Sequence, residues 1–316
     1  MKTTDLLDEN ELEQAQIMAA MSALAYQPGE AAAQGVKAFG MRLEALIDQP
    51  STGTQGFCAQ GMDFACIAFR GTEVQRLEDI IVDLLAWPVA YGSGKVHLGF
   101  RKAFASVEDQ VLEQLKKFQA LELPVYFTGH SLGGALAAMG AAFALDHNIT
   151  VGGLFTFGQP RVCNAAFEKQ YVERLQDRYY RFTNGQDLVP QVPIYFMGYR
   201  HFGMNSYRFN EKGDLTKESS RWKGYLVKTL GVLAWGAARS PEIREYLTKL
   251  FSKEPQDPDT LRPLAKEAVK AFFNISNRDI VSHHNMQTYL KNLQSLTAAP
   301  RLAAPAVPAV KEEVTP

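Results

Sequence analysis

The sequence predicts an α/β fold in which a mostly parallel central sheet carries helices on both faces. Its 316 residues, 46% of them hydrophobic and 21% charged, suit one large globular domain. Short apolar runs that predict strands alternate with longer stretches that predict helices, and this order gives parallel strands joined by helical crossovers. In addition, the glycine-framed Ser131 follows a predicted strand directly and opens a predicted helix.

The N-terminal part of the chain predicts two helices followed by two strands. The helices are expected over residues 10–26 and over Glu30 to Leu46, and the turn-rich segment Pro50-Ser-Thr-Gly-Thr54 ends the second one. Strands are expected over 56–60 and 63–69, on either side of a turn at Gly61. The second strand is apolar enough to lie inside the sheet.

The middle of the chain repeats strand and helix, and the last third is mainly helical. Helices are expected over 98–119, 131–146 and 164–174, and strands over 124–128, 151–157 and 178–183. After Asp214, helices are expected over 221–253 and 260–274, with Ser240-Pro241 starting one of them as cap and first-turn proline. The Ala- and Pro-rich residues 298–316 predict a disordered tail.

Charge, cysteine content and terminal composition exclude several classes of protein. The net charge of −1 and the lack of a long basic block argue against nucleic acid as a partner. Cys58, Cys66 and Cys163 have neither metal-site nor disulfide-framework spacing, so free thiols are expected. The acidic start is unlike a secretory signal, and no apolar run is long enough to span a membrane. A cytoplasmic location is therefore expected, or export without a recognisable N-terminal signal peptide.

The segment Thr128-Gly-His-Ser-Leu-Gly-Gly134 predicts a nucleophilic serine. Glycines on both sides of Ser131 permit a sharp turn from strand to helix, which projects the serine hydroxyl and aims the first helical amides at a developing oxyanion. The pattern alone is weak. The apolar strand before it and the Ala- and Leu-rich helix after it make a passive glycine-rich turn a poor alternative.

A serine nucleophile needs a base and an acid, which follow it in the chain order typical of such a turn. His97 and His130 precede Ser131, and His147 lies at a predicted helix end, so the candidate bases are His201, His283 and His284. Candidate acids are Asp146, Asp177, Asp187 and Asp214. Asp187 is favoured because it follows a strand at its carboxyl end, where the catalytic groups of open α/β sheets lie.

Seven ordered motifs resemble the class 3 lipase family, which comprises the lidded fungal triacylglycerol lipases and their bacterial relatives. The resemblance covers residues 64–209 and 279–293. The motifs are Ala68-Phe-Arg-Gly-Thr72, Lys95-Val-His-Leu-Gly-Phe100, Thr128-Gly-His-Ser-Leu-Gly-Gly-Ala135, Thr156-Phe-Gly-Gln-Pro-Arg-Val162, Asn184-Gly-Gln-Asp-Leu-Val-Pro190, Tyr199-Arg-His201 and His284-Asn-Met-Gln-Thr-Tyr289. Their common order is far more specific than any single motif, and it implies an α/β-hydrolase fold.

The resemblance also implies the residues of the site. Ser131 would be the nucleophile, Asp187 the acid and His284 the base, with His283 as the runner-up and His201 in a supporting role. The oxyanion would be bound at Thr72 and Leu132. No cofactor and no metal are expected, because the chemistry needs neither.

Two amphipathic segments concern contact with lipid. Leu77, Ile80, Ile81, Leu84 and Leu85, followed by Trp87, lie on one helical face, which indicates either the family's lid or an ordinary surface helix. A second apolar stripe, starting at Trp222 with basic residues beside it, is compatible with a membrane interface or with a helix packed over the sheet. Residues 1–297 are thus expected to form a single α/β-hydrolase domain, with a lid region at 72–94 and a helical insertion at 215–275.

The predicted function is a serine ester hydrolase, and specifically a lipase that hydrolyses acylglycerol esters and touches a lipid interface transiently. A carboxylesterase or a phospholipase A1 would use the same machinery. A catalytically silent lipid-binding protein should lack one member of the triad, and the lipase motifs argue against a serine peptidase.

Overall fold

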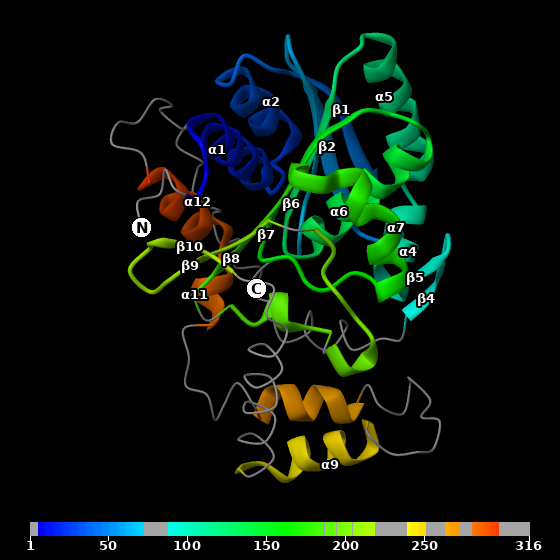
Figure 1. Ribbon diagram of the computed structural model, residues 1–316, viewed down its shortest axis with the longest axis vertical. Helices are drawn as coiled ribbons and strands as arrows, with labels where there is room; N and C mark the ends of the chain where they lie inside the picture. Colours follow the sequence, from blue (N-terminus) through cyan, green and yellow to red (C-terminus); the bar gives the residue numbers. More distant parts are fainter. Residues whose placement is uncertain are drawn as a thin grey trace, which may run out of the picture.

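The computed structural model describes residues 6–72, 88–185, 187–193, 195–203, 205–218, 239–250, 263–271 and 280–296. Within these residues the chain forms an eight-stranded sheet of order β1-β2-β3-β6-β7-β8-β9-β10 and a separate two-stranded ribbon, β4-β5 (Figure 1). The strands are β1 (Arg42–Gln49), β2 (Thr54–Gln60), β3 (Ala65–Phe69), β4 (Pro88–Tyr91), β5 (Gly94–His97), β6 (Val125–His130), β7 (Val151–Phe157), β8 (Tyr179–Asn184), β9 (Asn205–Phe209) and β10 (Leu215–Lys217).

The five central strands, β3 and β6 to β9, run parallel, whereas β1, β2 and β10 are antiparallel to their neighbours at the two sides of the sheet. The parallel register places Phe69 opposite Gly129, and Phe157 opposite both His130 and Phe182. The carboxyl ends of β3, β6, β7 and β8 therefore lie along one edge. Loops that leave this edge can bring together residues far apart in the sequence.

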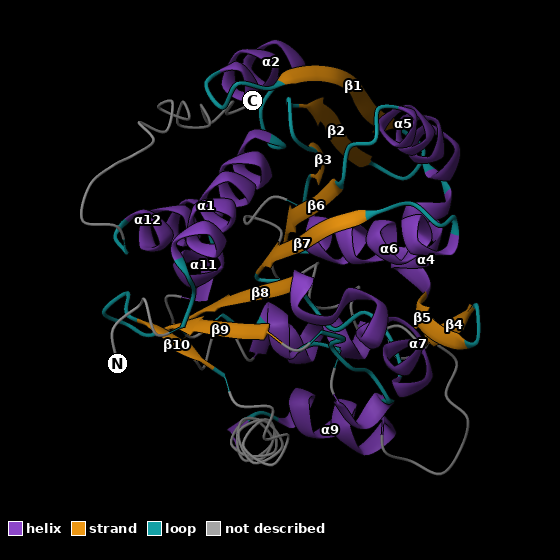
Figure 2. Cartoon of the chain, turned by 45° about the horizontal axis from the view of Figure 1, so that its top comes forward, coloured by secondary structure: helices purple, strands orange, loops and turns teal. Residues whose placement is uncertain are grey.

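Helices cover both faces of the sheet, as Figure 2 shows. One face carries α1 (Glu9–Leu24), α2 (Gly29–Lys37), α11 (Ile280–His284) and α12 (Met286–Gln294); the other carries α4 (Leu98–Ala105), α5 (Glu108–Ala120), α6 (Leu132–Asp146) and α7 (Ala165–Leu175). Helix α9 (Pro241–Leu250) packs against a further helix over residues 263–271 (Figure 1). The predicted mostly parallel sheet with helices on both faces is confirmed.

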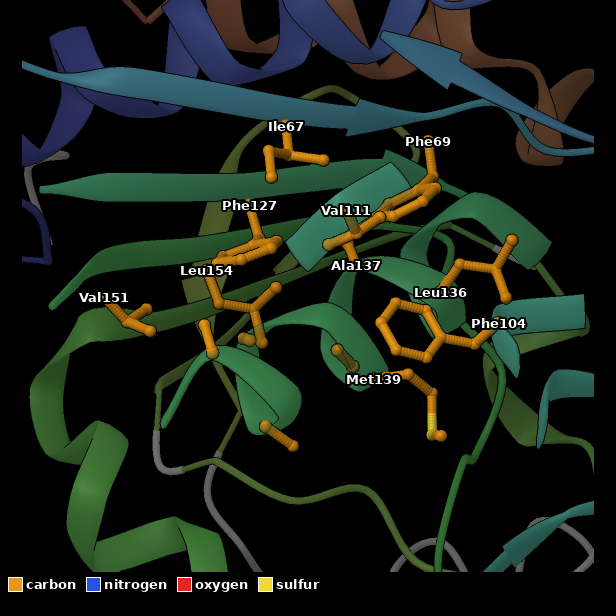
Figure 3. Packing of buried hydrophobic residues seen from close by; sticks show 14 of the residues in the cluster. Ile67, Phe69, Phe104, Val111, Phe127, Leu136, Ala137, Met139, Val151 and Leu154 are labelled. Atoms are coloured by element: carbon orange, nitrogen blue, oxygen red, sulfur yellow. The ribbon is translucent and has the colours of Figure 1, made fainter. Parts of the chain in front are cut away.

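Helix α6 is held firmly against the sheet by apolar packing (Figure 3). Its side chains Leu136 and Met139 are buried together with Phe127 of β6, Leu154 of β7 and Phe104 of α4. Full burial of each large apolar side chain contributes about 1.5–3 kcal/mol. Ser131, which stands between β6 and α6, is thus anchored to two rigid elements.

Some predicted elements differ from the structure. The helix expected over Glu30 to Leu46 is wrong after Lys37: Gly40 adopts a φ of +69°, and β1 begins at Arg42. Leu, Glu and Ala favour helices, but pairing with β2 overrides this preference. The helix expected over 98–119 is two helices, α4 and α5, which break at residues 106–107. Strands β4, β5, β9 and β10 were not expected.

Ser240 caps helix α9 as predicted, because its hydroxyl accepts the backbone N–H of Ile243 at 3.1 Å. The lid residues Leu77, Ile80, Ile81, Leu84, Leu85 and Trp87 lie outside the described residues, as do Trp222 with its apolar stripe and the tail 298–316. Of the helical insertion expected over 215–275, the described part contains β10, α9 and the helix 263–271.

Candidate active site

Ser131 lies on a strained turn between β6 and α6. Its φ of 57° and ψ of −128° are rare for a residue with a side chain, and such a conformation costs about 1–3 kcal/mol unless its surroundings impose it. Two glycines make the turn possible. A Cβ atom on Gly129 would lie 2.3 Å from the carbonyl carbon of Gly133, and one on Gly133 would lie 2.2 Å from the Phe69 carbonyl oxygen.

A continuous chain of hydrogen bonds joins Ser131, His284 and Asp187. The His284 Nε2 atom lies 2.8 Å from Ser131 Oγ, and its Nδ1 atom lies 3.0 and 2.9 Å from the two Asp187 oxygens. Because a carboxylate only accepts, Nδ1 carries the proton and Nε2 accepts the serine hydroxyl. The three residues are 0%, 0% and 2% exposed, respectively. They come from the end of β6, the end of α11 and the loop after β8.

Asp187 accepts hydrogen bonds from two further donors, one on each carboxylate oxygen. The Tyr289 hydroxyl donates to Oδ2 at 2.7 Å, and the Val189 backbone N–H donates to Oδ1 at 2.9 Å. Burial, followed by the nearby Asp187, raises the pKa of Tyr289 well above its usual value, so the phenol stays protonated and donates. Tyr289 ends the motif that begins at His284, but the five-residue spacing between them does not predict its contact with Asp187.

The other candidate bases are held away from Ser131. The His283 ring lies against Gly185, where an added Cβ would be 2.3 Å from its Nδ1, and the Asn184 side chain donates to the His283 carbonyl at 3.0 Å. His201 donates from Nε2 to the Pro190 carbonyl at 2.7 Å, in the loop that follows Asp187. His147 caps the end of α6, as expected.

His130 is buried against His284 and remains neutral. The two ring centroids are 4.6 Å apart. Burial lowers the pKa of His130 well below its usual value, and His284 lowers it further. Both ring nitrogens of His130 have partners other than Ser131 Oγ: its Nδ1 contacts the Tyr26 hydroxyl and its Nε2 the His284 carbonyl.

Thr72 and Leu132, the expected oxyanion residues, line one cavity of about 350 Å³. The remaining lining residues are Thr52, Gly53, Thr54, Gln55, Arg70, Gly71 and Leu136. Gly71, the residue before Thr72, lies directly beside the nucleophile, since a Cβ on Gly71 would lie 3.1 Å from Ser131 Cβ. Leu132 is the first residue of α6, where backbone N–H groups have no partner within the helix.

Two of the other candidate acids, Asp146 and Asp177, lie away from this arrangement. Asp177 is exposed in the turn before β8, at the opposite end of that strand from Asp187. Asp146 accepts the hydroxyl of Tyr171 at 2.5 Å and pairs with Arg174 at the far end of α6. In the described part of the chain, no cluster of three His, Cys, Asp or Glu side chains is arranged to hold a metal ion.

Comparisons with known proteins find similarity to lipases. Residues 66–197 match the family model described as lipase (class 3). Over 147 residues the chain is 35% identical to a secreted mono- and diacylglycerol lipase of Malassezia restricta, and the matched part is 43% of this chain and 49% of that protein. A lipase of Rhizomucor miehei is 35% identical over 148 residues, 43% of this chain and 39% of that protein. The chain thus spans about half the length of the curated relatives that it matches, or less.

Two solved structures extend the likeness to the fold. A triacylglycerol lipase whose catalytic centre is described as a serine protease triad superposes with a TM-score of 0.60 and 26% identity, over 69% of this chain and 90% of that one. The native Rhizomucor miehei lipase propeptide complex superposes with a TM-score of 0.57 and 27% identity, over 66% and 71% of the two chains. Residues 66–197 are therefore similar to the class 3 lipases, and the chain has the α/β-hydrolase fold.

Proposed function

We propose that this protein is a serine ester hydrolase, with Ser131 as nucleophile, His284 as base and Asp187 as the acid that orients the base. The observation that carries the proposal is the unbroken, buried hydrogen-bond chain from Ser131 Oγ through His284 to Asp187. Three residues scattered over more than 150 positions meet in the order and tautomer that acyl transfer requires.

The reaction proceeds in two halves through an acyl-enzyme. His284 Nε2 takes the Ser131 proton while Oγ attacks the ester carbonyl, and the resulting imidazolium is stabilised by the Asp187 carboxylate. When the tetrahedral intermediate collapses, the C–O bond to the alcohol breaks and His284 returns the proton to the leaving oxygen. A water molecule then attacks the acyl group in the same way, and Ser131 regains its proton.

The negative oxygen of each tetrahedral intermediate is proposed to lie between the backbone N–H groups of Thr72 and Leu132, with the Thr72 hydroxyl as a further donor. Both residues line one cavity, and Gly71, which precedes Thr72, lies beside Ser131; these two observations support the assignment. Loss of one such donor typically costs about 3–4 kcal/mol of transition-state stabilisation.

Acylglycerols are the proposed substrates. Relatives with 35% identity are named as mono- and diacylglycerol lipases, and a structural neighbour as a triacylglycerol lipase. The amphipathic segment Leu77–Leu85 is proposed to be a lid that contacts a lipid interface transiently; this proposal comes from its sequence alone. Carboxylesterase and phospholipase A1 activities are the alternatives on the same scaffold.

The location of the protein is a separate prediction. No described helix is long and apolar enough to cross a bilayer. Relatives are named as secreted, and for that reason alone export is proposed over a cytoplasmic location. Comparing the protein in culture supernatant and cell lysate, with a cytosolic marker as control, tests it.

The decisive experiment compares wild type with Ser131→Ala on a chain-length series of nitrophenyl esters, emulsified acylglycerols and a phospholipid. Wild type should hydrolyse acylglycerols, and Ser131→Ala should lose activity on every substrate while keeping its thermal unfolding temperature. Equal activity in Ser131→Ala would overturn the proposal. A rate that does not rise when the substrate exceeds its solubility would contradict the lid and leave an esterase, and hydrolysis confined to phospholipid would identify a phospholipase.

A further inference from the structure

His130, the residue before the nucleophile, forms two directional hydrogen bonds that the reaction itself does not use. Its Nε2 lies 2.6 Å from the backbone carbonyl oxygen of His284, and its Nδ1 lies 2.8 Å from the Tyr26 hydroxyl. A carbonyl only accepts, so Nε2 must carry the proton and Nδ1 must accept from Tyr26. The ring, which is fully buried, is therefore fixed in one tautomer and one orientation.

The carbonyl that His130 holds is one that a helix end would otherwise leave without a partner. His284 is the last residue of α11, and the final carbonyls of a helix have no donor within the helix. The sheet edge supplies donors for two of them: Asn184 donates to the His283 carbonyl at 3.0 Å, and His130 donates to that of His284. The backbone of the base is thus tied to β6 and β8 and does not rely on the short helix α11 alone.

Tyr26 links this contact to the N-terminal helix. It follows the end of α1, its ring lies beneath the Arg70 guanidinium at 5.6 Å, and its hydroxyl would be 2.4 Å from a Cβ on Gly71. Tyr26 therefore contacts both the residues that precede the proposed oxyanion residue Thr72 and the ring of His130.

We propose that His130, held in a single tautomer by Tyr26, is a positioning residue that fixes the backbone of His284 and thereby aims its Nε2 at Ser131. This inference rests on the proposed role of His284 as the base. The physical reason is that proton transfer needs an alignment within a fraction of an ångström, and a misplacement of about 1 Å can cost about 100-fold in rate. Because His130 is not proposed to contact the substrate, its substitution should lower kcat and leave KM nearly unchanged.

Three variants distinguish the hydrogen bonds of His130 from the space that its ring fills. Tyr26→Phe removes one hydroxyl and should lower kcat about 3- to 10-fold, because a buried hydrogen bond contributes about 1 kcal/mol. His130→Phe keeps a ring but removes the donor and should lower kcat about 10- to 100-fold. His130→Gln keeps an N–H donor at the position of Nε2 and should recover most of the loss. In all three, KM should stay within about twofold of wild type.

The matched control is Ser22→Ala. The Ser22 hydroxyl contacts the Thr128 hydroxyl at 2.7 Å, which is another buried hydrogen bond between α1 and β6. This substitution should lower the thermal unfolding temperature about as much as Tyr26→Phe does, yet leave kcat unchanged, because it does not touch His284.

The measurements are kcat, KM and thermal unfolding on a soluble ester for each variant, with Ser131→Ala alongside. Reduced kcat in Tyr26→Phe and His130→Phe, recovery in His130→Gln and normal kcat in Ser22→Ala support the inference. Wild-type kcat in folded Tyr26→Phe, or an equal loss of kcat in Ser22→Ala, would overturn it. Should Ser131→Ala retain activity, the proposed function itself fails; an inactive Ser131→Ala with wild-type kcat in the His130 variants refutes this inference alone.

Discussion

Substitution of Asp187 by asparagine removes one negative charge and one acceptor while it preserves the shape of the side chain. The carboxylate accepts three donors: the Val189 N–H on Oδ1, the Tyr289 hydroxyl on Oδ2, and His284 Nδ1, which lies 3.0 and 2.9 Å from the two oxygens. The Val189 N–H can only donate, whereas the tyrosine hydroxyl can also accept. The asparagine oxygen should therefore replace Oδ1, and the amide nitrogen should replace Oδ2.

The consequence falls on His284. Its Nδ1 would face an acceptor at one position and an N–H donor at the other, so the tautomer with the proton on Nε2 becomes accessible. In that tautomer Nε2 cannot take the Ser131 proton, and the imidazolium formed during attack also loses its counter-charge. We expect kcat to fall about 10³- to 10⁴-fold, which corresponds to about 4–5.5 kcal/mol of lost transition-state stabilisation.

The assay is hydrolysis of a soluble nitrophenyl ester under saturating conditions, with thermal unfolding to verify the fold. Asp177→Asn is the matched control, since this exposed carboxylate precedes β8 and lies at the other end of the strand. It should keep wild-type kcat. A folded Asp187→Asn protein with kcat within tenfold of wild type would refute the assigned role of Asp187.

Three further predictions follow from the same contacts. Tyr289→Phe removes a donor to the buried Asp187 carboxylate and should lower the free energy of unfolding by about 1.5–3 kcal/mol and kcat by about tenfold, as urea unfolding and steady-state kinetics will measure; unchanged values would contradict this contact. His284→Ala should abolish ester hydrolysis, whereas His283→Ala should retain most of it, and the reverse order in an activity assay would reassign the base. Burial and two nearby guanidinium groups lower the pKa of His201 well below 6.5. Below about pH 6.5 the unfolded chain therefore binds a proton that the folded chain does not, so the free energy of unfolding should decrease as the pH is lowered, by up to about 1.4 kcal/mol per pH unit. His201→Gln should reduce this slope in urea unfolding at several pH values, and an unchanged slope would contradict the prediction.

The central strands and the chain order of the site could be predicted because their signals are local. The apolar run before Ser131 and the glycines around it follow from what a buried strand and a sharp turn require. Asp187 could be ranked first because a strand precedes it. Strand β1 could not be predicted at Leu43–Leu46, because these residues favour a helix. Their pairing with β2 at the side of the sheet has no local sequence pattern.

The support around the triad could not be predicted from the sequence. Tyr26 lies 104 residues from His130, and Tyr289 lies 102 residues from Asp187, so only the tertiary fold brings each pair within hydrogen-bond distance. His130 could be excluded as the base because it precedes Ser131 in the chain. Its bond to the His284 carbonyl depends on where α11 ends, which no spacing rule supplies.

The central claim is that Ser131 is the nucleophile activated by His284, and covalent labelling tests it most directly. A fluorophosphonate ester should add one adduct per chain by intact mass, peptide mapping should place it on Ser131, and Ser131→Ala should remain unlabelled. Labelling should also slow severely in His284→Ala, because the serine hydroxyl then lacks its base. An adduct on another residue, or equal labelling of Ser131→Ala, would contradict the account.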